Sequence, residues 1–576
     1  MSDNPPIYTL YQKYLENVPN SENAIRLWGI IPANMAESQG YFEQIRSKYS
    51  TISPDLEGLK KAMKHQMMGL GILTSKVAKC IDNLENGAVE TGQQPNCLGG
   101  PSFILNKITY IWTLSGLGGG YVPLFYIGDY DSVQPELLNT RVPSPSAKGM
   151  LITYPSTTEY EGAPIRRLPN PDEEWFRKTL EKIESNYRGL LKGVESTKQE
   201  TVLQNLSHVF TILKNAYYST ENVADLSTKI IGSIINLEAD LGIPMLSATD
   251  PEIRGFFKHG YETLLSEPNR SSFIHASNEA VDLIESLGYR AQIGRRPSDY
   301  TPFFLECQTP SCHGNRVEMK YKSNSASTAS IEGKCPKCEQ VYSYSFEASK
   351  PDISEIAGMI TPRVDSRQVI VDSVVPVVAH VGGPGETSYY AEVIPGVKPL
   401  GIPFPTYTRY TRIFYNTPWN GVAAKELEKK GYPTLMRTEL FKALAAWVDA
   451  KKENNVEKTA KTHSEIRGTI DDTFQTLTKA KTDLESGVDE IKRHLGDPST
   501  RVAFLQEMKA KQSQAQMLDN YLSYAFGHYV PEKNGQEVSW AWIDIALSAG
   551  VSDIIGVYKR LYSGLTPNST VFFVNL

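Results

Sequence analysis

Two closely spaced pairs of cysteines constrain this chain more than any other feature of its sequence. Cys307 and Cys312 are separated by four residues, Cys335 and Cys338 by two, and 22 residues lie between the pairs. A tetrahedral zinc ion takes four thiolates, and short turns at the ends of a β-hairpin supply two each. The pattern predicts a structural zinc ribbon over residues 303–347 with a closed coordination shell. The neighbouring His313 is a spare ligand candidate, although a histidine in this position is more often a bystander. The alternative is four unligated thiols.

Composition places this ribbon inside a larger folded protein. The chain has 576 residues, enough for several domains, with 40% hydrophobic and 22% charged residues as in ordinary globular proteins. A net charge of −6 argues against a general nucleic-acid-binding surface, although it leaves a local basic patch open. Six cysteines are too few for a disulfide scaffold, and we find neither a signal-peptide pattern nor an apolar stretch that could span a membrane. These features predict a cytoplasmic protein.

The first half of the chain shows the pattern of a doubly wound α/β sheet. A long helix is expected over residues 57–86, followed by a short strand at 88–91 and a loop at 92–100. Pro101 suits the first turn of the next helix. Residues 122–127 then form a continuous apolar run, as a buried parallel strand does. This β–loop–α–β order predicts a parallel sheet.

The second half combines helices with a return to the sheet. Residues 172–290 and 421–530 show helical spacing, and residues 368–381 and 402–407 read as strands. Within 421–530 a heptad seam is formed by Ile470, Phe474, Leu477, Lys481, Leu484, Val488, Ile491 and Leu495. The break after it at Gly496-Asp497-Pro498 predicts an antiparallel helical hairpin.

We expect five segments. The first half of the core covers residues 1–170, a helical connecting region 171–300 and the zinc ribbon 301–350. The second half of the core covers 351–420, and the coiled-coil hairpin with the C-terminal segment covers 421–576.

The glycine- and glutamine-rich loop at 92–100 is the first candidate binding site. Backbone N–H groups at a helix N-terminus bind anions, and glycine lets a phosphate or carboxylate approach. The candidate binding residues are Gly92, Gln93, Gln94, Gly99, Gly100 and Lys107. The spacing matches neither a Walker loop nor the dinucleotide fingerprint, so an ordinary strand–helix turn is the alternative.

Two more loops are expected at the same edge of the sheet. Asp129 and Asp131 follow one apolar run, while Gly382, Gly383 and Glu386 follow another. In open α/β sheets, ligands bind beyond the carboxyl ends of the strands. Carboxylates there suit an amine, a metal-bound phosphate or base catalysis. Asp129, Asp131 and Glu386 are therefore candidate catalytic residues, and Gly382 and Gly383 are candidate binding residues, with solvated turns as the alternative.

These loops resemble the motifs of one known family. TGQQPNCLGGP (91–101) resembles the TGQQ-x-GLFTGP motif of the bacillithiol-biosynthesis cysteine-adding enzymes, the cysteine ligases. VPLFYIGDYD (122–131) falls where that family has a strand ending in Glu-Asp-His-Asp. Residues 240–254 look like its helical connecting region, and residues 360–393 are similar to its block with YVGGP-x-E-x-x-Y. The motifs follow the family's order and cover most of the chain.

The resemblance implies a fold and an activity. The fold would be a Rossmann-like core with helical connecting segments and a coiled coil that forms a homodimer. The activity would be ATP-linked addition of cysteine to glucosaminyl-malate. The positions that match the motifs are Gly92, Gln93, Gln94, Gly99, Pro101, Asp129, Asp131, Gly382, Gly383 and Glu386.

Three departures mark a divergent branch whose substrate can differ. Gly128 stands where the family has Glu, and Tyr130 where it has His. Tyrosine at its ordinary pKa does not replace an imidazole as a proton shuttle near neutral pH. The TGQQ block is one residue shorter, and the zinc ribbon is not part of the family's ordinary pattern.

Two hypotheses follow. In the first, the chain is a ligase that adds cysteine or another amino acid to an amine-bearing acceptor. In the second, it is a non-catalytic module whose ribbon and coiled coil bind protein or RNA. The second draws on the ribbon lysines Lys320, Lys322, Lys334 and Lys337.

Overall fold

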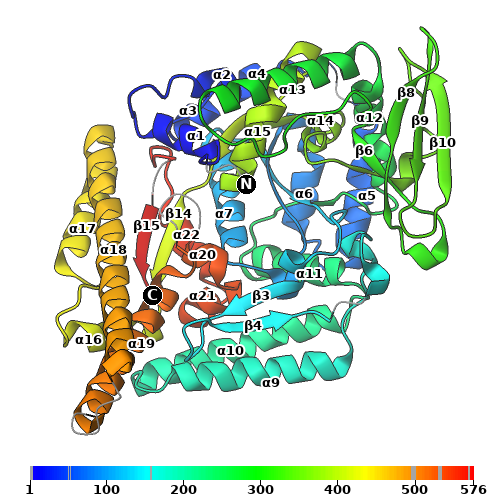
Figure 1. Cartoon of the computed structure of the whole chain (residues 1–576). Coiled ribbons are helices and arrows are strands. Elements are labelled where there is room, and N and C mark those ends of the chain that lie inside the picture. Colours follow the sequence, from blue (N-terminus) through cyan, green and yellow to red (C-terminus); the bar gives the residue numbers. More distant parts are fainter. Residues whose placement is uncertain are drawn as a thin grey trace.

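A five-stranded parallel sheet lies at the centre of the computed structural model, which describes residues 4–49, 51, 53–155, 158–494, 501–529, 535–568 and 571–576 (Figure 1). Its spatial order is β13-β12-β1-β2-β5. The strands are β1 (Ala88–Gln93), β2 (Val122–Ile127), β5 (Met245–Ser247), β12 (Val377–Gly382) and β13 (Thr406–Arg409). Following the chain, β2 and β5 are added on one side of β1, and β12 and β13 are then added on its other side. This is the Rossmann order, with its reversal between β1 and β12.

The residues of β1 and β2 explain their central position. Every residue of β2 is buried, as are the first five of β1. Between them, α7 (Phe103–Leu117) packs on both strands and is apolar on nearly all sides. A strand that is buried on both faces, or a helix that is buried on nearly all sides, has a continuous apolar sequence. The sequence therefore predicts these elements correctly.

The helix predicted for residues 57–86 is wrong as a single element. The chain forms α5 (Leu56–Gly69) and then α6 (Ser75–Asp82). Gly71 has φ +67°, a left-handed conformation that ends α5, and the Thr74 side chain accepts a hydrogen bond from Val77 N to start α6. Four short helices precede them, namely α1 (Tyr8–Leu15), α2 (Ala24–Trp28), α3 (Met35–Gln39) and α4 (Phe42–Arg46).

The connecting region is helical, as predicted, but also contains a strand of the sheet. Its helices are α9 (Glu173–Leu190), α10 (Ser196–Tyr217), α11 (Val223–Gly232), α12 (Lys258–Leu265) and α13 (Asn269–Ser286). The strand β5 has three residues, too few for any period to be visible in the sequence. Before this region, α8 (Pro135–Leu138) leads into a hairpin of β3 (Asn139–Val142) and β4 (Met150–Thr153).

The strand predicted for residues 368–381 is only half correct. The chain forms α14 (Arg367–Asp372) before β12 begins at Val377. All six residues of α14 are buried, and a short apolar run does not distinguish a buried helix from a buried strand. After β12, α15 (Pro384–Val397) packs against β12 and β13.

The region predicted as a ribbon lies in two small antiparallel sheets, drawn in green in Figure 1, and one of them also takes a strand from beyond the predicted segment. One has the order β11-β6-β7 and the other β10-β9-β8. The strands are β6 (Phe303–Glu306), β7 (Arg316–Glu318), β8 (Lys320–Ser323), β9 (Thr328–Lys334), β10 (Val341–Glu347) and β11 (Ile360–Pro362).

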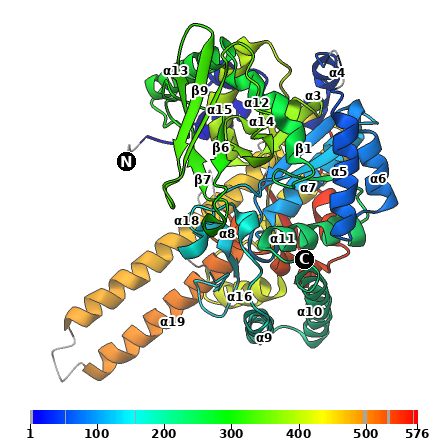
Figure 2. The same ribbon diagram turned by 90° about the vertical axis from the view of Figure 1, so that its right-hand side faces the viewer.

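A long helical hairpin projects from the body of the protein (Figure 2). It consists of α18 (Val456–His494) and α19 (Arg501–Phe526), and α16 (Pro418–Glu428) and α17 (Thr438–Lys452) pack beside it. The pairs Lys481–Asp519 and Gly487–Lys511 show that the two helices are antiparallel. Ile470, Leu477, Val488 and Ile491 of the predicted seam are buried, and Leu495 lies outside the described residues.

The C-terminal segment returns to the core. It contains α20 (Gln536–Ser539), α21 (Trp542–Ala549) and α22 (Ile554–Lys559), and then β15 (Val571–Asn575), which pairs in parallel with β14 (Arg412–Asn416). Among the described helices, none combines the length and the apolar character needed to cross a bilayer.

Candidate active site

A cavity of about 450 Å³ opens at the carboxyl ends of β1, β2 and β12, where the strand order reverses. This is the position at which doubly wound sheets bind ligands. Its lining includes Gly92, Gln93, Gln94, Phe103, Tyr126, Gly128, Tyr130, Asp131, Glu136, Arg367, Gly383, Gly385, Glu386, Tyr389 and Tyr410. All three loops selected from the sequence therefore contribute to one site.

The end of β1 is joined to the loop after β2 by a chain of amides. Gln93 Nε2 donates to Gln94 Oε1 at 2.8 Å, and Gln94 Nε2 donates to Asp131 Oδ2 at 2.9 Å. A Cβ on Gly92 would lie 3.2 Å from the carbonyl oxygen of Tyr126, so glycine allows the two strands to end close together. The predicted residues Gly92, Gln93 and Gln94 thus lie in the cavity.

Gly99 and Gly100 lie elsewhere, outside the cavity lining. A Cβ on Gly99 would come within 2.8 Å of Ile230, and one on Gly100 within 2.6 Å of Asn96. Their N–H groups donate to the carbonyls of Asn96 and Cys97, at 3.0 Å each. These two glycines are needed for packing, and their amides are not turned toward a ligand.

Asp129 and Asp131 have separate environments. The Asp129 carboxylate accepts hydrogen bonds from Ser247 Oγ at 2.5 Å and Thr249 N at 3.1 Å, and pairs with Arg166 at 3.2 Å. Its side chain is 1% exposed, and it fastens β2 to the end of β5. Asp131 lines the cavity, where burial raises the pKa of its carboxyl despite the opposing effects of Arg316 and Gln94.

Glu386 lines the floor of the cavity, whereas the predicted binding residue Lys107 lies outside the lining and is buried behind Glu386. Glu386 Oε2 accepts from Lys107 Nζ and from Gly383 N, each at 2.7 Å, and Lys107 Nζ also donates to the carbonyl of Gly92 at 2.7 Å. Burial acts to raise the pKa of Glu386, but Lys107 and His380 outweigh it and lower that pKa to about 2. Burial lowers the pKa of Lys107, although Glu386 opposes the shift. Gly382 is fixed below them, because a Cβ there would lie 2.5 Å from Tyr407 Oη.

A buried polar network beneath this floor was not predicted from the sequence. Glu90 of β1 pairs with Arg367 and accepts from Gln368 Nε2 at 2.8 Å, and His380 of β12 lies between Glu90 and Glu386. Burial acts to raise the pKa of Glu90, but Arg367 and His380 lower it to about 2. Glu90 and His380 could have been identified from the sequence as ionisable residues inside otherwise apolar strands.

The lining favours a cationic ligand. Its acidic side chains are Asp131, Glu136 and Glu386, and its aromatic rings are Phe103, Tyr126, Tyr130, Tyr389 and Tyr410. Two of the charged lining residues are paired, Arg367 with Glu90 and Glu386 with Lys107, so Asp131 and Glu136 supply the rest of the negative charge of the lining. Carboxylates and aromatic faces together attract an ammonium group.

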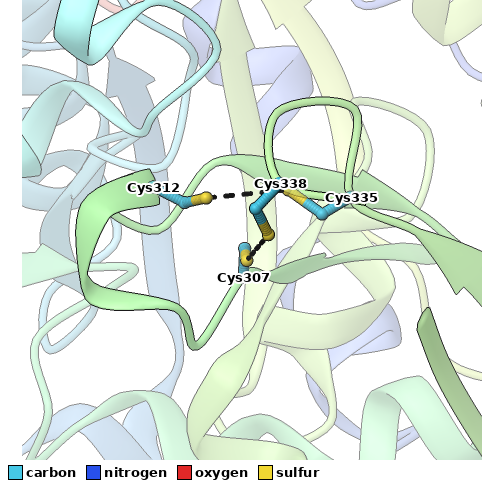
Figure 3. Close-up of side chains that lie close together, drawn as sticks. All are labelled: Cys307, Cys312, Cys335 and Cys338. Atoms are coloured by element: carbon cyan, nitrogen blue, oxygen red, sulfur yellow. Dashed lines mark hydrogen bonds between the residues drawn. The ribbon is translucent and has the colours of Figure 1, made fainter. Parts of the chain in front are cut away.

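The four cysteines of the two pairs converge on one point (Figure 3). Their Sγ atoms all lie within 4.8 Å of one another, with 3.6 Å between Cys307 and Cys338 and 4.0 Å between Cys312 and Cys335. None of the four is in a disulfide. The group could hold a metal ion, whereas Nε2 of His313 is engaged at 2.7 Å by Glu159.

The cysteine cluster is braced against the rim of the cavity. Asn315 Nδ2 donates to the carbonyl of Glu161 at 2.8 Å, and Arg316 N donates to that of Gly162 at 3.0 Å. In the segment that continues from Glu161 and Gly162, Ile165 N donates to the carbonyl of Asp131 at 2.7 Å. The knuckle that carries Cys312 therefore supports the loop that carries Asp131.

The ribbon lysines do not form a bare basic patch. Lys320 pairs with Asp299 at 3.3 Å, Lys334 with Glu339 at 3.0 Å, and Lys322 lies 3.8 Å from Glu332. Nucleic-acid binding depends on positive charge that is free to neutralise phosphates. These pairs weaken the hypothesis that the ribbon binds RNA.

Comparison with known proteins agrees with this site. A family model described as "Bacillithiol biosynthesis BshC, N-terminal Rossmann-like domain" matches residues 5–409. Three similar curated proteins are each named "Putative cysteine ligase BshC" and are each 23% identical to this chain. The Carboxydothermus hydrogenoformans protein aligns over 498 residues, 81% of each chain. Those of Chlorobium phaeobacteroides and Bacillus cereus align over 68% and 60% of this chain, and over 62% and 58% of their own lengths.

Proposed function

We propose, from the premise that this chain belongs to the bacillithiol-biosynthesis BshC family, that it is a ligase joining cysteine to an amine-bearing acceptor. One observation carries the proposal: three separate loops bring carboxylates and aromatic rings to a single cavity at the reversal point of a Rossmann sheet. The bond formed would be a carbon–nitrogen bond between the cysteine carboxyl and the acceptor amine.

An amino sugar such as glucosaminyl-malate is the acceptor we propose. Its ammonium group suits the cavity, where Asp131 and Glu386 approach from two different loops and Glu136 lies at the side. Lys107 and Gly383 N hold the Glu386 carboxylate in one position, so that it can orient the amine. Asp131 is positioned in the same way by Gln94.

ATP is proposed to activate the cysteine carboxyl. The N-terminus of α15 offers the place for its phosphates, because Gly385 lines the cavity there and a Cβ on it would meet nothing within 4 Å, whereas the N–H of Gly383 is already bonded to Glu386. The N-terminus of a helix favours negative charge. When bound, ATP would supply the leaving group that makes the carboxyl reactive toward an amine.

The cysteine cluster is proposed to hold structural zinc. Four thiolates are the donor set that zinc prefers, and four protein ligands leave no open position for chemistry. The helical hairpin of α18 and α19 is proposed as the contact of a homodimer. Neither role involves the reaction itself.

The experiment that tests this function is a comparison of cells with and without the gene. Low-molecular-weight thiols are labelled with a maleimide reagent and profiled by mass. We expect a cysteine-containing thiol to vanish in the deletion strain while its thiol-free amino-sugar precursor accumulates. The wild-type gene and a Glu439→Gln control, altered at an exposed acid on α17, should restore the thiol, whereas Glu386→Gln should not. An unchanged thiol pool in the deletion strain would rule out the cysteine ligase.

A further inference from the structure

His380 occupies an unusual position below the cavity floor. It lies in β12, is 0% exposed, and has its ring between two carboxylates from different elements. Nε2 lies 3.4 Å from Glu386 Oε1, and Nδ1 lies 3.6 Å from Glu90 Oε2. Glu386 in turn reaches the cavity, with its side chain 18% exposed. The imidazole is therefore one contact away from a bound substrate.

Both ring nitrogens of His380 face charged neighbours. Arg367 Nη2, which can only donate, and Glu386 Oε1, which as a carboxylate oxygen can only accept, both lie 3.4 Å from Nε2. A ring that takes a proton from Glu386 must accept it at Nε2, which requires the proton of the neutral ring to be on Nδ1, facing Glu90. Within the described residues, Nδ1 has no hydrogen-bond partner at normal distance. The rings of Tyr390 and Tyr407 stack on the imidazole, with centroids at 5.0 and 6.1 Å, and fix its plane.

The charges around His380 balance when the ring is neutral. Glu90 and Glu386 supply two negative charges, and Arg367 and Lys107 supply two positive charges. A substrate ammonium adds one positive charge to this group. Moving its proton to His380 keeps the total unchanged, so the transfer adds no uncompensated charge to a buried site.

We propose that His380 takes up, through Glu386, the proton that the acceptor amine loses before it attacks the activated carboxyl. The amine N–H bond breaks with its electron pair left on nitrogen. The proton passes to the Glu386 carboxylate and from Oε1 to Nε2 of His380. The inference rests on the proposed ligase, and His380 acts through Glu386 without touching the substrate.

One geometric feature supports this assignment. Lys107 Nζ and Gly383 N both donate to Oε2 of Glu386, at 2.7 Å each, so Oε1 is the oxygen that faces Nε2 of His380.

The first test measures the ring itself and needs no activity. Histidine labelled with ¹⁵N shows which nitrogen carries the proton, and the resonance missing from His380→Gln identifies the residue. We expect Nδ1–H and an unprotonated Nε2 in the ligand-free protein near pH 8. A proton on Nε2 under these conditions would overturn the relay.

The second test compares rates of amide formation from cysteine, ATP and glucosaminyl-malate. We expect His380→Gln to lose about 10²-fold in kcat, with KM for the acceptor little changed. The matched control is His463→Gln, at a buried histidine where α18 meets β15, and it should keep the wild-type kcat.

The outcomes distinguish a failure of the proton relay from a failure of the proposed ligase activity. If the wild-type protein makes no amide, the proposed ligase fails, and the nitrogen measurement still decides the state of His380. If the wild-type protein is active and His380→Gln keeps its kcat, the relay fails while the ligase stands.

Discussion

Lys107 of α7 and Glu386 of α15 are held 2.7 Å apart, and this ion pair joins the helices that follow β1 and β12, the two neighbouring strands at which the strand order reverses. The Lys107 side chain is 1% exposed and also donates to the carbonyl of Gly92. The pair therefore serves both stability and the orientation of Glu386.

Removing the lysine alone should be costly. Lys107→Met leaves the Glu386 carboxylate without its cation, and losing one partner of a buried pair typically costs about 3–5 kcal/mol. We expect a clear fall in Tm by calorimetry, with part of it recovered in Lys107→Met/Glu386→Gln. The control is Arg188→Met, which breaks an exposed pair with Glu184 and should cost less than about 1 kcal/mol. A Tm for Lys107→Met equal to that of the control would contradict the role of the pair.

The two aspartates of the β2 loop should behave differently. Asp129→Asn weakens the acceptor for Ser247, Thr249 and Arg166, so it should lower Tm. Asp131→Asn should leave Tm nearly unchanged and raise KM for the acceptor by roughly tenfold, the effect of about 1.4 kcal/mol of lost binding. Thermal melts and steady-state kinetics on both variants check the prediction. Equal effects on Tm and KM would show that the two carboxylates do not have separate roles.

The sequence predicts the parts of this fold that depend on residues close to one another along the chain. β1, β2 and the paired cysteines are recognisable because their signals lie within a few residues of one another. Glu90 and His380 are not recognisable as a pair, since nearly 300 residues of chain separate two strands that lie side by side. Gly99 and Gly100 were wrongly predicted to bind a ligand. The sequence does not distinguish a glycine that is required because a Cβ would collide with Ile230 or Asn96 from a glycine that leaves room for a phosphate.

The cysteine cluster should bind zinc at about one ion per chain. Elemental analysis of the purified protein checks the stoichiometry, and Cys335→Ser should lose the metal while Cys80→Ser, at a cysteine outside the cluster, keeps it. Because Asn315 and Arg316 brace residues 161–162, chelation should also speed hydrogen exchange in that segment. A metal-free protein with unchanged exchange after chelator treatment would contradict the structural role.

His463 should make the fold sensitive to mild acid. Burial lowers the pKa of His463 to about 4. The unfolded chain binds this proton near pH 6.5 and the folded chain only near pH 4, so stability falls as pH drops through that window. His463→Gln does not titrate, and its Tm should decline less than that of the wild-type protein between pH 7 and pH 5. The exposed His275→Gln serves as the control, and a parallel decline in all three would refute the assignment.

The central claim is that this cavity forms an amide between cysteine and an amine. The measurement that tests it most directly is incubation of the purified protein with cysteine, ATP and glucosaminyl-malate, followed by mass analysis of the acceptor. The account predicts a product heavier by one cysteine less one water, formed by the wild-type protein and lost in Glu386→Gln. An acceptor of unchanged mass with the folded, metal-loaded protein would contradict it.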